Sequence, residues 1–163
     1  MKNRSKLPHE WLFYLHLQED SDWSIKSYID MTEIHTVEDA VLLNDEISYD
    51  LIKKTMMFLM KKDILPIWED EHNKDGGCFS YKILNKDVET VWQNVYYTLI
   101  GKSITKDISD HDLINGVTLS PKKKFCILKI WMRDCTLNDP SIFIDINNMS
   151  PSGCIFRKHC PNN

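Results

Sequence analysis

Large apolar side chains recur at every second position along the first part of the chain. Between residues 9 and 17, one face carries Trp11, Phe13, Leu15 and Leu17, and the other carries Leu12, Tyr14 and His16. Alternation with a period of two predicts a strand. Short apolar runs bounded by turn residues predict further strands at residues 25–34, 78–84, 116–119, 125–132 and 154–156.

Helical spacing governs other segments. Apolar residues recur every three or four positions over residues 87–100, which predicts a helix that ends at Gly101. Thr36 stands three residues before Asp39, the spacing of a capping box, so a helix is expected over residues 37–47. Shorter helical segments are expected at residues 50–62, 109–112 and 139–147.

The order of these elements is strand, strand, helices, strand, helix, hairpin, helix, strand. It has too many strands for βαβ alternation and predicts an α+β fold, with helices backing a curved antiparallel sheet. A length of 163 residues suits one domain, which we expect over residues 7–163 after a flexible tail at 1–6. No apolar stretch approaches 18 residues, so no membrane span is expected.

Composition and motifs indicate the compartment in which the chain functions and whether it has catalytic residues. The start of the chain does not resemble a signal peptide, and the five cysteines form no C-x-x-C pair. Both observations favour a reducing compartment, the cytoplasm. The chain has no nucleophile motif, phosphate loop or dinucleotide fingerprint, so we expect a protein that is not an enzyme and has no cofactor. The acids of residues 69–71, followed by His72, are expected to face water rather than hold a metal.

Charge is distributed unevenly along the chain. The net charge of −4 excludes a protein that coats nucleic acid by bulk attraction. Residues 122–133 nevertheless carry Lys122, Lys123, Lys124, Lys129 and Arg133 with no acid among them. This run indicates either a focused anion site or lysines that guard an exposed strand edge.

Two of the five tryptophans lie in polar loops. Trp11 and Trp92 have apolar neighbours typical of a core, whereas Trp23 and Trp68 are flanked by acids and turn residues. Two indoles can sandwich a flat ring, and a cationic ring binds more strongly. An adjacent carboxylate can read the two neighbouring N–H groups of guanine, and lysines can hold phosphates. The combination predicts 7-methylguanosine with its polyphosphate, the mRNA cap, as ligand.

Several motifs occur in a recognisable order from residue 7 to about 133. They are Trp11; Trp23; residues 36–39 (TVED); residues 64–70 (ILPIWED) with Asn73, Gly76 and Gly77; Trp92; residues 99–101 (LIG); Ser109-Asp110; Gly116-Val117; and residues 129–131 (KIW). In these motifs the chain resembles the eukaryotic translation initiation factor 4E family of cap-binding proteins. That family has a curved antiparallel sheet with helices packed on its convex face.

The resemblance assigns roles to individual residues. Trp23 and Trp68 would stack on the methylated base, Glu69 would accept the guanine N–H bonds, and Trp131 would lie beside the methyl group. Lys122 falls near a phosphate-binding position of the family, and Lys124 is a possible second contact.

The sequence departs from the family at its partner-binding face and its phosphate path. On the convex face the family binds a scaffold or repressor peptide. This chain keeps the valine at Val37, but Val41 stands where the family has a tryptophan, and Tyr97 stands where it usually has a leucine. Residues 78–79 (CF) replace an Arg-Trp pair, which removes one basic group.

From the resemblance we expect a monomer that brings capped mRNA to translation initiation, with an altered partner surface. The alternatives are a cap-binding repressor or decoy that does not engage the scaffold, and a nucleotide enzyme that uses the acids near Glu69.

Overall fold

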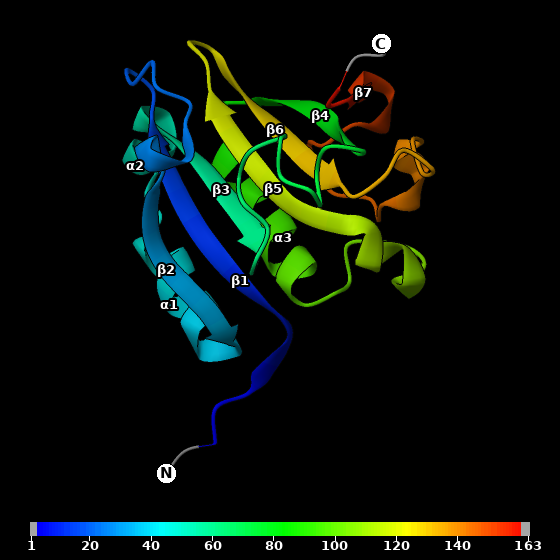
Figure 1. The fold of residues 1–163 in the computed structure, drawn as a ribbon, viewed down its shortest axis with the longest axis horizontal. Coiled ribbons are helices and arrows are strands. Elements are labelled where there is room, and N and C mark those ends of the chain that lie inside the picture. Colours follow the sequence, from blue (N-terminus) through cyan, green and yellow to red (C-terminus); the bar gives the residue numbers. More distant parts are fainter. Residues whose placement is uncertain (1–2, 161–163) are drawn as a thin grey trace.

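The computed structural model describes residues 3–160, in which seven strands form one curved sheet (Figure 1). The strand order is β2-β1-β3-β5-β6-β4-β7, and every neighbouring pair is antiparallel. The strands are β1 (Lys6–Leu17), β2 (Ile29–Thr36), β3 (Thr55–Lys61), β4 (Gly77–Leu84), β5 (Ile114–Pro121), β6 (Phe125–Met132) and β7 (Ile155–Lys158).

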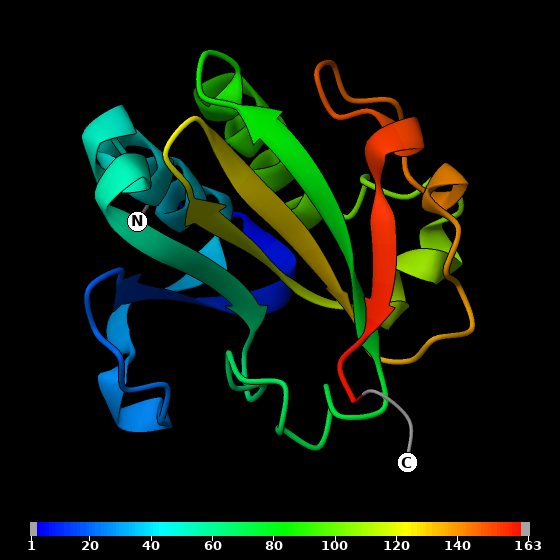
Figure 2. The ribbon, with the colours of Figure 1, turned by 90° about the horizontal axis from the view of Figure 1, so that it is seen from above.

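The helices lie on the convex face of the sheet. They are α1 (Val37–Glu46), α2 (Tyr49–Lys54) and α3 (Val88–Ile100). Figure 2 shows them on one side, with the loops that follow β1 and β3 on the other. The expected α+β fold is therefore confirmed. None of the helices among residues 3–160 is long and apolar enough to cross a bilayer.

Alternation along the strands separates two hydrophobic cores. On β1, Trp11, Phe13 and Leu15 belong to the large core beneath the helices. Tyr14, on the opposite face, belongs to a smaller core with members from the other strands. The small core consists of Tyr14, Phe58, Met60, Ile64, Cys78 and Trp131. The concave face therefore has an apolar floor of its own beneath the loops.

The capping box predicted for α1 is present. The Asp39 amide donates to Thr36 Oγ1 at 3.2 Å, and the Thr36 amide donates to Asp39 Oδ2 at 3.0 Å. Part of the expected tail is attached to the same turn: Arg4 pairs with Asp39 at 3.3 Å, and the Val37 amide donates to the Ser5 carbonyl at 2.9 Å.

The expected helix over residues 50–62 is wrong in its second half. Helix α2 ends at Lys54, and residues 55–61 form β3 between β1 and β5. A strand with two neighbours and cover on both faces is a continuous apolar run rather than an alternating one. Such a run cannot be distinguished from a buried helix by its pattern.

Three other segments differ from the expected elements in extent or in type. The expected strand at 25–34 begins with a 3₁₀ turn (Ile25–Ser27) before β2. Residues 139–147 contain only a 3₁₀ turn (Pro140–Ile142), because Phe143 pairs as a bridge with Thr105. The helix expected at 109–112 is a 3₁₀ helix (Ile108–Leu113) capped by Asp107.

Candidate functional site

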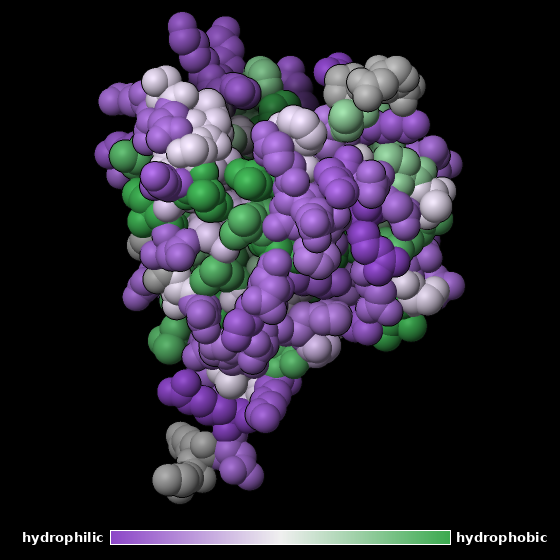
Figure 3. All heavy atoms as spheres, in the orientation of Figure 1, coloured by the Kyte–Doolittle hydropathy of each residue, from purple (hydrophilic) through white to green (hydrophobic). Residues whose placement is uncertain are grey.

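A cavity of about 280 Å³ opens on the concave face, between the loop after β1 and the loop after β3. In Figure 3, which shows this face, hydrophobic side chains are exposed beside a largely hydrophilic surface. The cavity brings together the four residues expected to bind the base. Its lining residues are Trp23, Tyr28, Met56, Phe58, Pro66, Ile67, Trp68, Glu69, Thr118, Ser120, Lys129 and Trp131.

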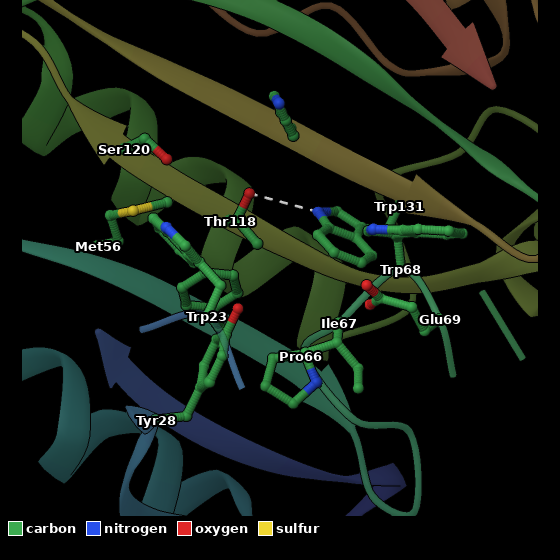
Figure 4. A pocket seen from close by; sticks show the side chains of 12 residues that line it. Trp23, Tyr28, Met56, Pro66, Ile67, Trp68, Glu69, Thr118, Ser120 and Trp131 are labelled. Carbon is green, nitrogen blue, oxygen red and sulfur yellow. Dashed lines mark hydrogen bonds between the residues drawn. The ribbon is translucent and has the colours of Figure 1, made fainter. Parts of the chain in front are cut away.

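Trp23 and Trp68 lie on opposite sides of this cavity, and the Glu69 carboxylate points toward its middle (Figure 4). Trp23 is 50% exposed and Trp68 is 45% exposed, so each indole presents a large free surface. Trp131 is buried between them and donates from Nε1 to Thr118 Oγ1 at 3.3 Å. Two exposed indoles, a buried third and an acid thus share one opening.

The loop that carries Trp68 is held by buried polar side chains. Asp70 accepts hydrogen bonds from the amides of Leu65 (3.0 Å) and His72 (2.8 Å). The Asn73 amide group donates to the Leu65 carbonyl at 3.0 Å, and Asn115 on β5 donates to Asn73 Oδ1 at 2.9 Å. Asn73 and Asn115 are almost fully buried, so these bonds fix the loop on the sheet.

Glu69 differs from its neighbour Asp70. Among residues 3–160 its carboxylate has no hydrogen-bond or ion-pair partner, although it lines the cavity. Burial, reinforced by the Glu69 charge, raises the pKa of Tyr28 to about 12. The Tyr28 hydroxyl therefore stays protonated in the cavity wall, and the Glu69 carboxylate is free to accept hydrogen bonds from a ligand.

The lysine that lines the cavity is Lys129, two residues before Trp131 on the same face of β6. Lys122 and Lys124 lie in the exposed β5–β6 loop and are not lining residues. The Lys122 carbonyl accepts from Lys53 Nζ at 2.9 Å. The phosphate role expected for Lys122 and Lys124 therefore stays a prediction.

Sequence reasoning missed a second cation on this face, Arg157. It pairs with Cys78 across the β4–β7 ladder, and Cys78 pairs with Trp131 on β6. Directly paired residues point to the same side of a sheet. Burial raises the pKa of the Cys78 thiol, and the charges of Lys129 and Arg157 oppose that shift. Arg157 therefore places a positive charge beside Cys78 on the concave side of the sheet.

The residues expected to bind a partner lie on the helical face, away from the cavity. Val37 and Val41 on α1 and Tyr97 on α3 are all exposed. Tyr96, next to Tyr97, is instead buried and donates its hydroxyl to the Ala40 carbonyl at 2.7 Å.

Within the described residues 3–160, one group of side chains has the composition of a metal site. Ligand atoms of His9, His111 and Asp112 lie within 4.8 Å of one another. However, Lys102 Nζ is 3.3 Å from the Asp112 carboxylate, and Lys61 Nζ donates to the His111 carbonyl at 3.5 Å. Two cations at the same place oppose a metal ion, so we assign none.

The chain forms a single antiparallel sheet with helices on one face and a cavity lined by aromatic residues and an acid on the other. This arrangement defines a small α+β ligand-binding domain. The family described as Eukaryotic initiation factor 4E matches residues 6–149, and the chain belongs to this family. This confirms the resemblance. Because the family consists of cap-binding translation factors, it also confirms the expectation that the chain is not an enzyme.

Individual relatives agree with this assignment. A translation initiation factor 4E homolog of Acanthamoeba polyphaga mimivirus is 29% identical over 136 residues, covering 71% of this chain and 50% of the relative. The Saccharomyces cerevisiae factor is 32% identical over 107 residues, covering 63% of this chain and 49% of the relative. The chain spans about half the length of the curated relatives it matches.

Solved structures show the same fold. Ascaris suum eIF4E-3, solved with an m2,2,7G cap, has a TM-score of 0.73 at 23% identity, covering 82% of this chain and 76% of that chain. Schistosome eIF4E, solved with m7GpppG and 4E-BP, has a TM-score of 0.68 at 25% identity, covering 83% of this chain and 75% of that chain.

Proposed function

We propose that this chain binds the 7-methylguanosine cap of mRNA and acts in translation initiation in the cytoplasm. One observation supports this above the others: Trp23, Trp68 and Glu69, whose carboxylate has no partner within residues 3–160, converge on one cavity. Family members have been solved with cap analogues, which supports the same ligand class.

The cavity suits a flat cationic purine. Stacking on an indole contributes about 1–3 kcal/mol per base, and a cation over the ring adds about 0.5–2 kcal/mol. Glu69 accepts hydrogen bonds from the two adjacent N–H groups of guanine. Each of these hydrogen bonds contributes about 1.5–3 kcal/mol because the acceptor is charged. Trp131 forms the apolar floor beside the methyl group. After the cost of association, micromolar affinity or better is expected, about −8 kcal/mol.

The polyphosphate leaves the base along the positive side of the cavity. Lys129 lines the cavity, and Arg157 extends the positive charge across Cys78 toward β7. Lys122 and Lys124 sit in the loop at the far end of the same hairpin, where they reach phosphates further from the base. Guanidinium and ammonium groups are the usual phosphate partners in proteins.

The test is retention on a cap-analogue resin. Trp68→Ala removes one stacking face and should abolish retention, whereas Trp68→Phe keeps a flat ring and should bind with reduced affinity. In solution, 7-methyl-GTP should quench tryptophan fluorescence at far lower concentration than GTP, because GTP lacks the cationic ring. Undiminished retention of Trp68→Ala would falsify the sandwich.

The helical face supports a role in protein binding. Val37, Val41 and Tyr97 expose apolar surface on α1 and α3, and relatives have been solved with 4E-binding proteins. We propose that a scaffold or repressor peptide binds there to the monomer. A pull-down with Y-x-x-x-x-L-Φ peptides separates the two roles: binding supports an initiation factor, and its absence favours a cap-binding repressor or decoy.

A further inference from the structure

A buried histidine lies directly behind one of the two exposed tryptophans. The imidazole of His16 on β1 stacks on the indole of Trp23, with ring centroids 4.0 Å apart and planes within 2°. His16 is fully buried, whereas half of the Trp23 surface is exposed. One face of the indole is therefore covered by His16, and the other is left for a ligand.

The same imidazole ties down the loop that carries Trp23. His16 Nε2 lies 2.8 Å from the Asp22 carbonyl oxygen and 3.1 Å from Ser27 Oγ. A carbonyl only accepts, so Nε2 carries the proton and donates. The tether reaches the residue immediately before Trp23, so ring position and loop position depend on one side chain.

The two indoles are supported differently. Among residues 3–160 Trp68 has no aromatic ring against it, and its loop is held instead by Asp70, Asn73 and Asn115. Within the same described residues, the Trp23 loop has only acids as side-chain acceptors, both in exposed hydrogen bonds, Asp20 for the Asp22 amide at 2.9 Å and Asp22 for the Ser24 amide at 2.8 Å, whereas its indole is stacked on His16. A side chain that orders a binding ring in advance reduces the entropy lost on binding.

We propose that His16 is a positioning residue for the base-binding cavity: its flat ring holds the Trp23 indole with its outer face open to a purine. This inference rests on the proposed function for its ligand, but the position of Trp23 can be measured without one. The ring stack carries the effect, and the hydrogen bond to Asp22 supports it.

Three substitutions at His16 separate these contributions. His16→Phe keeps a flat ring but loses the donor, His16→Gln keeps a donor without a ring, and His16→Leu keeps neither. Because an aromatic pair contributes enough to change an equilibrium about 2- to 10-fold, we expect Leu and Gln to weaken 7-methyl-GTP binding by up to 10-fold. His16→Phe should remain within about twofold of the parent.

His111 provides a matched control. It is also fully buried, and its Nε2 lies 2.8 Å from a backbone carbonyl, that of Leu99. Its ring lies against His9 rather than a tryptophan. His111→Leu should therefore cost stability as His16→Leu does, while leaving 7-methyl-GTP affinity unchanged.

A measurement without ligand distinguishes this inference from the proposed function. In a Trp68→Phe background, Trp11, Trp92 and Trp131 are buried and Trp23 is exposed. Quenching of tryptophan fluorescence by acrylamide therefore reports on Trp23. Quenching should increase in His16→Leu and His16→Gln, but not in His16→Phe.

The outcomes decide both questions. Unchanged acrylamide quenching in His16→Leu overturns the positioning role. The role is also overturned if His16→Gln binds 7-methyl-GTP with full affinity while His16→Phe binds it more weakly. If the parent protein itself does not bind 7-methyl-GTP, the proposed function fails, and the quenching series still tests His16. Should the Leu variant not fold, the comparison of Phe with Gln decides.

Discussion

Glu69 and Asp70 are neighbouring acids with opposite structural roles, and neutralising each in turn separates recognition from folding. Glu69 lines the cavity with no partner among residues 3–160, so Glu69→Gln removes a charge and little else. The Asp70 side chain is only 9% exposed and accepts bonds from Leu65 and His72. Asp70→Asn places an NH₂ group where one of these backbone donors points.

The expected magnitudes follow from those contacts. Glu69→Gln converts charge-assisted bonds to the guanine edge into neutral ones and sets a donor against a donor, a loss of about 1.5–3 kcal/mol. That equals about 10- to 150-fold in Kd for 7-methyl-GTP. The free energy of unfolding should change by less than about 0.5 kcal/mol, because the position is unpaired. Asp70→Asn should cost about 1–3 kcal/mol of stability through its unsatisfied groups.

Fluorescence titration with 7-methyl-GTP and urea unfolding of both variants provide the assay. A 7-methylinosine nucleotide, which lacks the exocyclic amino group, is the matched ligand for the parent protein. The guanine-reading role of Glu69 is refuted if Glu69→Gln binds as tightly as the parent, or if the parent binds inosine and guanine nucleotides equally.

Two further predictions concern charge. Lys129→Ala should flatten the dependence of log Kd on log salt by about one unit, and replacing Lys122 and Lys124 together should flatten it too; a slope unchanged in both variants would place the phosphates elsewhere. Burial lowers the pKa of His111 to about 4, so on acidification the unfolded chain gains this proton first and stability falls. The fall should reach about 2 kcal/mol between pH 7 and 5 and be smaller in His111→Gln, measured by urea unfolding; equal slopes in both proteins would contradict it.

The parts of the fold that sequence predicts well are those specified by local chemistry. The strand at residues 9–17 alternates because each of its faces meets a different core, and α1 begins where Thr36 and Asp39 cap it. By contrast, residues 56–60 of β3 are apolar at every position, because Met57 and Leu59 enter the large core while Phe58 and Met60 enter the small one, and such a run resembles a buried helix.

The site shows the same division. Trp23 and Trp68 stand out because large aromatics are unusual in polar loops, and Glu69 because it directly follows one of them. His16 and Arg157 could not be found that way, because their roles depend on a loop that folds back and on a strand pairing. No spacing rule links residue 16 to Trp23, and none links residue 157 to Cys78.

The sheet separates the two proposed functions of the molecule physically. Successive residues of a strand point to opposite faces, so side chains that line the cavity and side chains that enter the large core beneath the helices alternate along β3 and β6. The exposed apolar surface at Val41 and Tyr97 therefore shares no residue with the cavity. The proposed partner surface can therefore change without altering the indoles and the acid that line the cavity. Coupling between the two faces would require movement of the strands themselves, and the seven-stranded ladder resists such movement.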